Sequence, residues 1–497
     1  MTTLSSVLDK LIQSLCLDDF PCGRGSKGRK AEHREDRQAL VDLITCPRSP
    51  WRQQHPWSPE AELLRDEAAR TPEHLRSPAN PAVFRTLRVV DRGVCVIDDG
   101  LLRFSNLETL VLSANQICDI SPGRLPASLK VLELHANSLR GLTALIRQNL
   151  PKLHHLGVGS NRLGSRDDTR HLTGTFWPSL VSLDLSWCEF QDQRVLAQAL
   201  ATLPSLRTLS LEGNPLSLVP SYPGFMIDSL QLLLYLDAQR VTPDQRHGFK
   251  GLSREYRERA VATVRIQRVR GVPEPQRDPD PSAPEFPVVE YSYRVSYDFL
   301  QLLTHTTAAL AWDQCMDFFH TQTLVVQDLP GLKRFLVQGL WLRLEEDKVL
   351  SWPAIPEEIK PTESPKDRKG VKGKEEKSAR SKDKKKKGVS EPLVRGGPVT
   401  TERGRVHVPL HALLHREPTV NNLRCRDHTD RLNRFCFDPC RGKAQKNVEA
   451  EALTEDCGAT ARQEPITVEF SLTLEKWRSA SEANPLQHPS VEPTGCP

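Results

Sequence analysis

The chain has 497 residues, of which 38% are hydrophobic, and carries a formal net charge of +5, so it is long enough for two folded units with polar tails. Its 12 cysteines follow no regular framework and its N-terminus is polar, which argues against a secreted protein. No apolar run approaches the roughly 20 residues of a membrane-spanning helix. We therefore expect a soluble, cytoplasmic protein in a reducing environment.

The positive charge is concentrated in one stretch. Lys366 to Lys387 holds 12 basic and 4 acidic residues, a local charge of +8, which leaves −3 for the rest of the chain. Such a run repels itself and stays solvated, so we predict a disordered Lys-rich insert over 361–397. Binding of nucleic acid, of an anionic membrane or of acidic tubulin tails is the alternative, although no aromatic residue in the run could stack on bases.

The first 80 residues show helical spacing. One apolar stripe is followed by a second candidate helix around Leu40 to Ile44 and a third from Glu60 to Arg70. We predict a helical N-terminal region, 1–80, that covers the open end of the next unit, with a partner-binding helix as the alternative. The first stripe comprises Leu4, Val7, Leu8, Leu11, Ile12 and Leu15.

One sequence pattern recurs five times in the next stretch. Aliphatic residues occupy relative positions 1, 4 and 6, and Asn or Cys closes position 9, as in Leu107-Glu-Thr-Leu110-Val-Leu112-Ser-Ala-Asn115. The pattern resembles the leucine-rich repeat, in which one short strand and its return segment cannot bury their apolar face unless they stack on neighbours. The amide at position 9 can satisfy backbone groups in the bend, and Cys188 can substitute there. The copies begin at Leu107, Leu129, Leu153, Leu180 and Leu206.

Degenerate copies flank these five. Phe84 to Val89 precedes them, and Leu233 to Arg246 resembles the capping motif of phosphatase-regulatory repeats, with Ala238 in place of the usual Gly. Steps of 22, 24, 27 and 26 residues between copies suit extended or 3₁₀ returns when short and α-helices when long. We predict an α/β leucine-rich repeat solenoid, a horseshoe of seven turns over 81–250 with an N-terminal helical cap.

The default binding surface of such a solenoid is its concave, strand-lined face, where positions 3, 5 and 7 meet solvent. Acidic residues there form a stripe with an aromatic anchor, which predicts a protein partner with a basic contact surface. The alternative is an ordinary solvated surface with no partner. The predicted partner-binding residues are Glu133, His135, His155, Asp184, Trp187, Glu212, Tyr235 and Asp237.

From residue 251 the pattern changes to alternating strands, and we predict a β-rich, sandwich-like domain over 251–360 and 398–480, with a disordered tail over 481–497. The candidate strands are Val264–Val272, Val289–Tyr297, Leu336–Leu344, Arg405–Leu410 and Ile466–Leu474. The first strand with its Gly271-Val272-Pro273 end, Gly404–Leu413 and the last strand resemble the C-two family of calcium- and lipid-binding sandwiches. That family needs clustered acidic oxygens, and the only candidates are Asp278 and Asp280, so we favour a metal-free, protein-contact sandwich.

Signatures of phosphate-cradling loops, serine hydrolases and zinc proteases are absent from the sequence. One cluster has metal-like spacing, namely Cys425, His428, Cys436 and Cys440, but its seven-residue gap favours a cysteine-bearing loop over a zinc site. His407, His411 and His415 recur every four residues, and we treat them as incidental because Pro409 argues against one helical face.

These observations predict a non-enzymatic protein-interaction scaffold or adaptor without cofactor, metal or small-molecule substrate. Similar capped-repeat proteins are often found in motile cilia and axonemes, so by analogy the cilium is an expected location. A regulatory subunit of a phosphatase is one alternative function, and a basic-patch binder of nucleic acid or anionic membrane is another. The sequence identifies neither the partner nor the oligomeric state.

Overall fold

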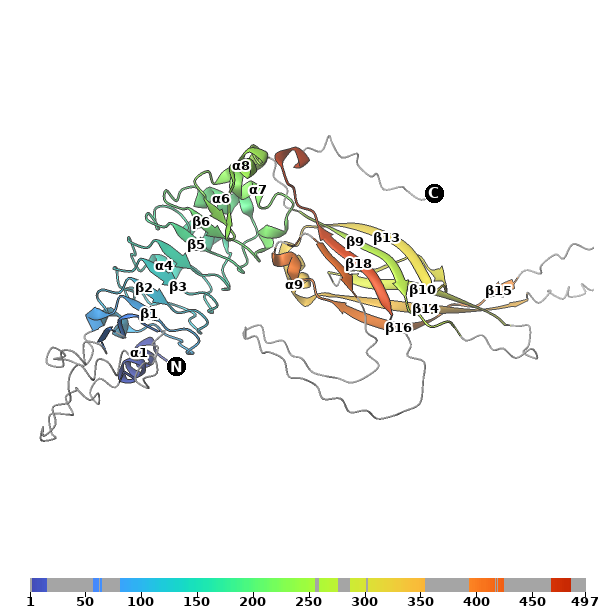
Figure 1. Cartoon of the computed structure of the whole chain (residues 1–497), viewed down its shortest axis with the longest axis horizontal. Coiled ribbons are helices and arrows are strands. Elements are labelled where there is room, and N and C mark those ends of the chain that lie inside the picture. The colour runs from blue at the N-terminus through green and yellow to red at the C-terminus, as the bar shows by residue number, and fades with distance from the viewer. Residues whose placement is uncertain are drawn as a thin grey trace, which may run out of the picture.

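The computed structural model describes residues 2–15, 57–61, 63–64, 81–254, 259–275, 287–300, 303–353, 393–415, 417, 419–423 and 466–483. Within these ranges the chain forms a curved solenoid and a second, β-rich unit beside it (Figure 1). One eight-stranded sheet runs through the solenoid, and β1 to β7 pair in parallel in chain order. Its strands are β1 (Thr86–Arg88), β2 (Thr109–Val111), β3 (Val131–Glu133), β4 (His155–Gly157), β5 (Ser182–Asp184), β6 (Thr208–Ser210), β7 (Tyr235–Leu236) and β8 (Gln239–Arg240). The seven turns predicted from the leucine spacing are confirmed.

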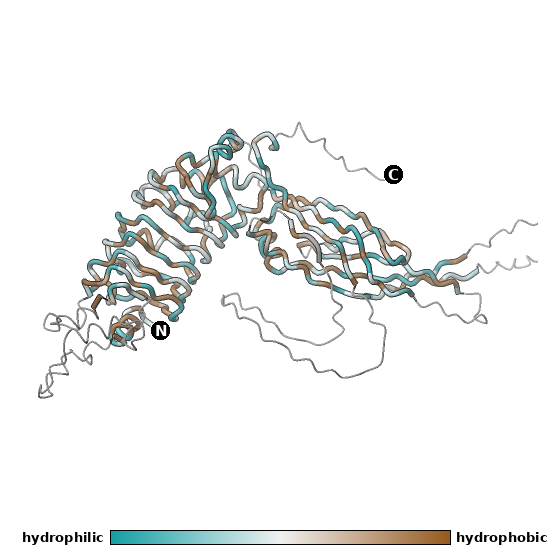
Figure 2. The backbone as a smooth tube through the Cα atoms, viewed as in Figure 1, coloured by the Kyte–Doolittle hydropathy of each residue, from teal (hydrophilic) through white to brown (hydrophobic). Residues whose placement is uncertain are grey.

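Direct register aligns the leucines of successive turns. Leu110, Leu132 and Leu156 are Cα partners across β2, β3 and β4, and all three are buried. The row continues through β5, β6 and β7, so the apolar positions of each short strand are covered by those of its neighbours. Figure 2 shows hydrophobic residues recurring along the coils of the solenoid. Stacking therefore builds the single core that one repeat alone could not form.

A ladder of asparagines holds the bends after the strands. The Asn161 Nδ2 donates to the Leu134 carbonyl of the preceding turn at 3.0 Å and to the Val158 carbonyl of its own turn at 2.9 Å, while its Oδ1 accepts from the Leu139 amide at 2.9 Å. Buried Cys188 continues the ladder with one weaker contact, from Sγ to the Val158 carbonyl at 3.6 Å. The predicted structural role of this cysteine is confirmed.

Return segments follow the repeat lengths. The 22-residue step has no α-helix in its return, whereas the longer steps carry α4 (Thr143–Ile146), α5 (Arg166–His171) and α6 (Gln193–Leu200). Ser165 begins α5 with a capping box, in which its side chain accepts from the Asp168 amide and the Asp168 carboxylate accepts from the Ser165 amide. This pairing satisfies two donors that a helix start otherwise leaves free.

Different elements occupy the two ends of the solenoid. At the N-terminal end, α1 (Leu4–Gln13) buries Leu4 and Leu8 beside the 3₁₀ helix η3 (Asp99–Arg103). At the other end, α7 (Gly224–Ser229) and α8 (Pro243–Gly248) flank a tight β7–β8 hairpin. Asp237 and Ala238 form the turn of this hairpin with φ of +48° and +61°. Both central residues of a type I′ turn need positive φ, so Ala238 adopts the conformation for which glycine is usual.

The second unit contains two antiparallel sheets. The six-stranded sheet comprises β10 (Val288–Phe299), β11 (Leu303–Thr306), β12 (Leu310–Ala311), β14 (Leu340–Pro353), β15 (Leu393–Arg395) and β16 (Val399–Val408). The four-stranded sheet has the order β13 (Cys315–Val326), β9 (Ala260–Arg270), β18 (Thr467–Leu474) and β17 (Thr419–Leu423). The Tyr297 hydroxyl of β10 lies 3.2 Å from the His320 Nε2 of β13, so the two sheets are in contact.

Some predicted boundaries differ in the structure. The expected strand Leu336–Leu344 begins inside a helix, because α9 (Leu329–Gln338) joins β13 to β14 and ends at Gly339 with φ of +81°. The alternating residues of β10 are buried from Tyr293 onward, whereas Val289 is 40% exposed because this end of the strand extends past the core. Leu393–Arg395 pair with β14 although they lie in the expected Lys-rich insert, and residues 361–392 of that insert lie outside the described residues.

Candidate functional site

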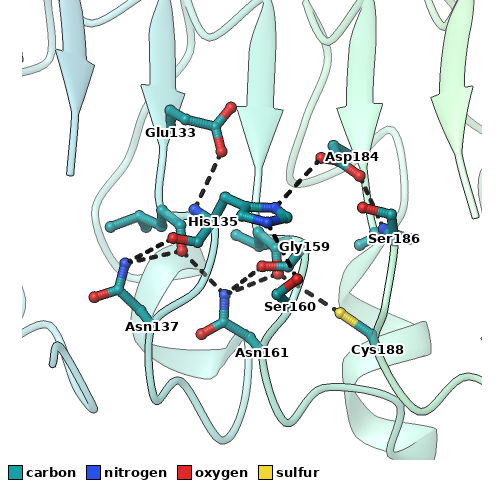
Figure 3. A network of polar contacts seen from close by, with 12 residues as sticks. Glu133, His135, Asn137, Gly159, Ser160, Asn161, Asp184, Ser186 and Cys188 are labelled. Carbon is teal, nitrogen blue, oxygen red and sulfur yellow. Dashed lines mark hydrogen bonds and ion pairs between the residues drawn. The ribbon is translucent and has the colours of Figure 1, made fainter. Parts of the chain in front are cut away.

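Two histidine–carboxylate pairs occupy the strand-lined face of the solenoid, across β3, β4 and β5. The His155 Nε2 lies 3.0 Å from the Glu133 Oε2, and its Nδ1 lies 2.9 Å from the Ser182 Oγ. The His135 Nδ1 lies 3.8 Å from the Asp184 Oδ2, and its Nε2 lies 3.1 Å from the Ser160 Oγ (Figure 3). The structure therefore brings four of the predicted residues together, and we call Glu133, His135, His155 and Asp184 the concave cluster.

Two glycines make room for the concave cluster. A Cβ at Gly157 would lie 2.0 Å from the Glu133 Oε2, and one at Gly159 would lie 2.8 Å from the His135 Nδ1. The third turn thus supplies the carboxylate and the imidazole, and the fourth turn supplies the space over which they lie. Side chains at these two glycine positions would have to displace them.

The charge of the concave cluster depends on the His135 imidazole. The Asp184 carboxylate raises the pKa of His135, although burial acts in the opposite direction. Burial alone would raise the pKa of Asp184, but His135 and the Ser186 hydroxyl and amide outweigh it and lower that pKa. At 3.8 Å the His135–Asp184 contact is too long for a hydrogen bond and acts through charge. Protonation of His135 therefore offsets the negative charge of Asp184 on this surface.

The C-terminal part of the same face contacts the second unit. The ring of His415, in the 3₁₀ helix η6 (His411–His415), lies 4.9 Å from the Trp187 ring between centroids. The His415 Nδ1 lies 2.5 Å from the Glu212 Oε1. Trp187 has φ of +55° and lies against Gly213, where a Cβ would be 2.5 Å from the indole. Two of the predicted partner-binding residues, Trp187 and Glu212, are thus engaged by a segment of the same chain.

Further contacts extend this joint along the loops that follow β5 and β6. The Nζ of Lys333, on α9, donates to the Cys188 carbonyl at 2.6 Å and to the Glu189 Oε1 at 2.8 Å. The Lys476 Nζ donates to the Ser217 and Val219 carbonyls. The Trp477 amide donates to the Pro220 carbonyl at 2.9 Å. Residues far apart in sequence therefore fix the second unit to the last turns of the solenoid, as Figure 1 shows.

The last two predicted residues have different environments. Tyr235 is 43% exposed on β7. Asp237 does not lie on the exposed stripe, because its positive φ turns it inward and leaves the residue only 6% exposed. Its Oδ1 accepts from the Leu211 and Glu212 amides at 2.6 and 3.0 Å, and its other oxygen accepts from the Tyr222 hydroxyl. Asp237 is thus a structural residue of the last turn, and its assignment to the partner surface was wrong.

Sequence reasoning missed the residues of the joint. His415 was treated as incidental, and no role was predicted for Lys333 or Lys476, because a single basic residue carries no periodic signal. Lys333 offered one clue, because it follows Leu332 and precedes Phe335 and Leu336 on a short apolar helix where a lysine has to be paired if it is buried.

Neither metal nor membrane features were found in the part of the chain that the structure covers. Within the described ranges, no three His, Cys, Asp or Glu side chains gather as a metal site would require, and no helix is both long and apolar enough to cross a membrane. The zinc candidates Cys425, His428, Cys436 and Cys440 and the calcium candidates Asp278 and Asp280 lie outside the described residues.

Comparison with known proteins places these features in a family. The family described as the leucine-rich repeat-containing protein 43 N-terminal domain matches residues 11–76, and the one described as the C-terminal domain matches residues 302–488. Leucine-rich repeat-containing protein 43 of Homo sapiens is 28% identical over an alignment 630 positions long, gaps included, which covers 97% of this chain and 95% of the human protein. The Mus musculus protein is 39% identical over 324 residues, 60% of this chain and 48% of the mouse protein.

Among solved structures, a chain of the Drosophila melanogaster SNF/U2A' complex is 22% identical, with a TM-score of 0.23, over 33% of this chain and 78% of that chain. The C-terminal family match begins at β11 and includes α9, η6 and β18. It therefore contains every residue that contributes to the joint from the second unit. From the two family matches and the human relative aligned along nearly its whole length, we conclude that the chain belongs to the leucine-rich repeat-containing protein 43 family.

Proposed function

We propose that this chain is a non-enzymatic scaffold or adaptor that binds a partner protein through the concave cluster. The observation that supports the proposal is the division of the strand-lined face into two parts. The C-terminal part, with Trp187 and Glu212, is engaged by His415 of the same chain. The concave cluster keeps partly exposed side chains, from 22% for Glu133 to 39% for His135.

The chemistry of the concave cluster favours a basic contact on the partner. Both carboxylates are held in place, Glu133 by its bonds to the His155 ring and the His135 amide, and Asp184 by the Ser186 amide. A lysine or arginine of the partner could approach the exposed edges of these fixed carboxylates without a large loss of side-chain entropy. We place this interaction in the cytoplasm, within the cilium or axoneme.

The test compares two double variants of the full chain by proximity labelling and affinity purification in ciliated and non-ciliated cells. Glu133→Gln with Asp184→Asn removes both charges of the concave cluster and keeps the side-chain shapes. Asp119→Asn with Asp167→Asn removes two exposed charges from the return segments and serves as the matched control. We expect specific partners to be lost from the first variant and retained by the second.

Retention of every partner by the concave-cluster variant would overturn the proposal. Loss of partners from both variants would also count against it, since the effect would then follow net charge instead of position. A partner found only in ciliated cells supports the proposed location, and one found equally in both cell types contradicts it.

A further inference from the structure

One edge strand of the second unit has nine consecutive positions, 318–326, without a charged residue or a proline. β13 is the outermost strand of the four-stranded sheet, and among the described strands its only partner in that sheet is β9 (Figure 1). Residues 318–326, Phe-Phe-His-Thr-Gln-Thr-Leu-Val-Val, contain no Lys, Arg, Asp, Glu or Pro. Exposed edges of soluble proteins are commonly blocked by such residues, so this edge is a template for strand addition.

The outer face of β13 also exposes apolar side chains at both ends of this stretch. Phe319 is 75% exposed and Val325 is 59% exposed, with exposed Thr321 and Thr323 between them. The register with β9 shifts between Asp317 and His320, and Phe319 has φ of +46° there. Bulges of this kind redirect a side chain, and here the bulge directs a phenyl ring away from the core.

The spacing of these residues is complementary to itself. If two copies of β13 pair in antiparallel orientation about a twofold axis through Gln322, Phe319 of one copy lies opposite Val325 of the other, and Thr321 lies opposite Thr323. Aromatic pairs with β-branched residues and Thr–Thr pairs are favourable cross-strand neighbours. No like charges meet across residues 318–326 in this arrangement.

Neighbouring registers are less favourable. An antiparallel twofold axis has to pass through a residue, because opposed side chains lie on the same face of the sheet. An axis through Thr321 would place Asp317 opposite Val325, and an axis through Thr323 would place Phe319 opposite Gln327. Only the Gln322 register pairs both exposed apolar residues with each other.

A row of threonines already crosses the sheet toward this edge. Thr419, Thr473, Thr263 and Thr323 are Cα partners in β17, β18, β9 and β13. Thr419 and Thr473 hydroxyls lie 3.1 Å apart, and those of Thr263 and Thr323 lie 3.4 Å apart. The Gln322 register would continue this row with Thr321 of a second copy. We propose that the chain forms a homodimer in which two β13 edges pair about Gln322 and join their sheets.

The test uses charge repulsion and its rescue in the full chain. Thr321→Lys with Thr323→Lys brings lysines opposite each other in the dimer, and Thr321→Glu with Thr323→Glu does the same with carboxylates. We expect sedimentation equilibrium to show a wild-type dimer, a dissociation constant weakened by roughly tenfold or more in each double variant, and restored heterodimers when the two variants are mixed. Ser471→Lys, on the same face of the central strand β18, is the matched control and should leave the dimer intact.

Three results would overturn the proposal. The first is a wild-type chain that remains monomeric at tens of micromolar concentration, where interfaces of modest size associate. The second is a dimer that survives both double variants. The third is failure of the mixed variants to associate although each retains the circular dichroism spectrum of the wild type, since loss of fold would then not explain the result.

Discussion

Replacing Lys333 by methionine should loosen the joint between the solenoid and the second unit. The Lys333 side chain is only 10% exposed, and its Nζ donates to the Cys188 carbonyl at 2.6 Å and to the Glu189 carboxylate at 2.8 Å. Methionine keeps most of the apolar stem and removes the charge and the donors. The side chain of Glu189 is 51% exposed, so its carboxylate can return to water, and the main cost is the Cys188 carbonyl left without this donor.

The expected cost follows from these two bonds. A hydrogen bond from a charged donor to a buried acceptor contributes about 1.5–3 kcal/mol, whereas the exposed ion pair adds less than about 1 kcal/mol. Opening of the joint should therefore become roughly 10- to 150-fold more frequent. Hydrogen–deuterium exchange of the α9 amides measures this directly, because exchange of a locally opening segment follows its opening free energy.

Glu189→Gln is the matched control for this prediction. It removes the ion pair and leaves the Cys188 bond, so the α9 amides should exchange less than about fivefold faster. Unchanged exchange in the Lys333→Met variant would refute the reasoning. An effect of Glu189→Gln as large as that of Lys333→Met would refute it equally, since the exposed pair would then be the stronger contact.

Three further predictions concern the solenoid. Asn161→Ala removes hydrogen bonds to two turns and should lower the free energy of unfolding by about 2–4 kcal/mol, whereas Cys188→Ala should lower it by less than about 1.5 kcal/mol. Urea denaturation measures both losses, and equal losses would contradict the stabilising role of the asparagine ladder. The neighbouring carboxylate raises the pKa of His135. The stabilising contribution of the protonated imidazole is therefore complete below the pKa of the unfolded state, about 6.5, and is lost as pH rises through the pKa of the folded state. The melting temperature of His135→Gln should therefore fall below that of the wild type at acidic pH and converge with it at alkaline pH, and a difference that grows with pH would exclude this pairing. At Gly164 (φ +135°) a Cβ would lie 2.3 Å from the Glu189 backbone, whereas at Gly123 (φ +73°) it would meet nothing within 4 Å. Thermal unfolding should therefore show that Gly164→Ala destabilises the protein by about 2 kcal/mol or more and Gly123→Ala by only about 1 kcal/mol. Equal effects of the two substitutions would show that the backbone contact at Gly164 is relieved.

Periodic features of the fold were predictable from the sequence, and single contacts were not. Aliphatic residues at positions 1, 4 and 6 recur in the five central turns, so the parallel strands, their register and the role of Cys188 followed from spacing alone. The concave cluster was predictable as a set of residues, because positions 3, 5 and 7 of a strand share a face. The pairing of Glu133 with His155 could be seen only in the coordinates, because it joins side chains from two turns that meet over a glycine.

The second unit was harder to predict, for physical reasons. Alternation in β9, β10 and β18 marks half-buried strands, but β13 has Thr and Gln on both sides of its pattern and was not recognised as a strand. The helical residues Leu336 and Val337 are apolar like the strand that follows, so only Gln338 and Gly339 mark the boundary between helix and strand. Asp237 was misplaced because two consecutive residues with positive φ interrupt the alternation that assigned it to the surface.

The thiol at Cys188 has a consequence for dividing the protein. At this turn the ladder has a single weak contact where asparagine would donate twice, and the carbonyl of the same residue is served by Lys333 from 145 positions further along the chain. A fragment ending at Arg254 would keep every leucine of the solenoid but would lack the Lys333 contact at the one central turn that has a thiol in place of the asparagine. Fraying should therefore begin in the middle of such a fragment, near the fifth strand, and spread outward toward both ends.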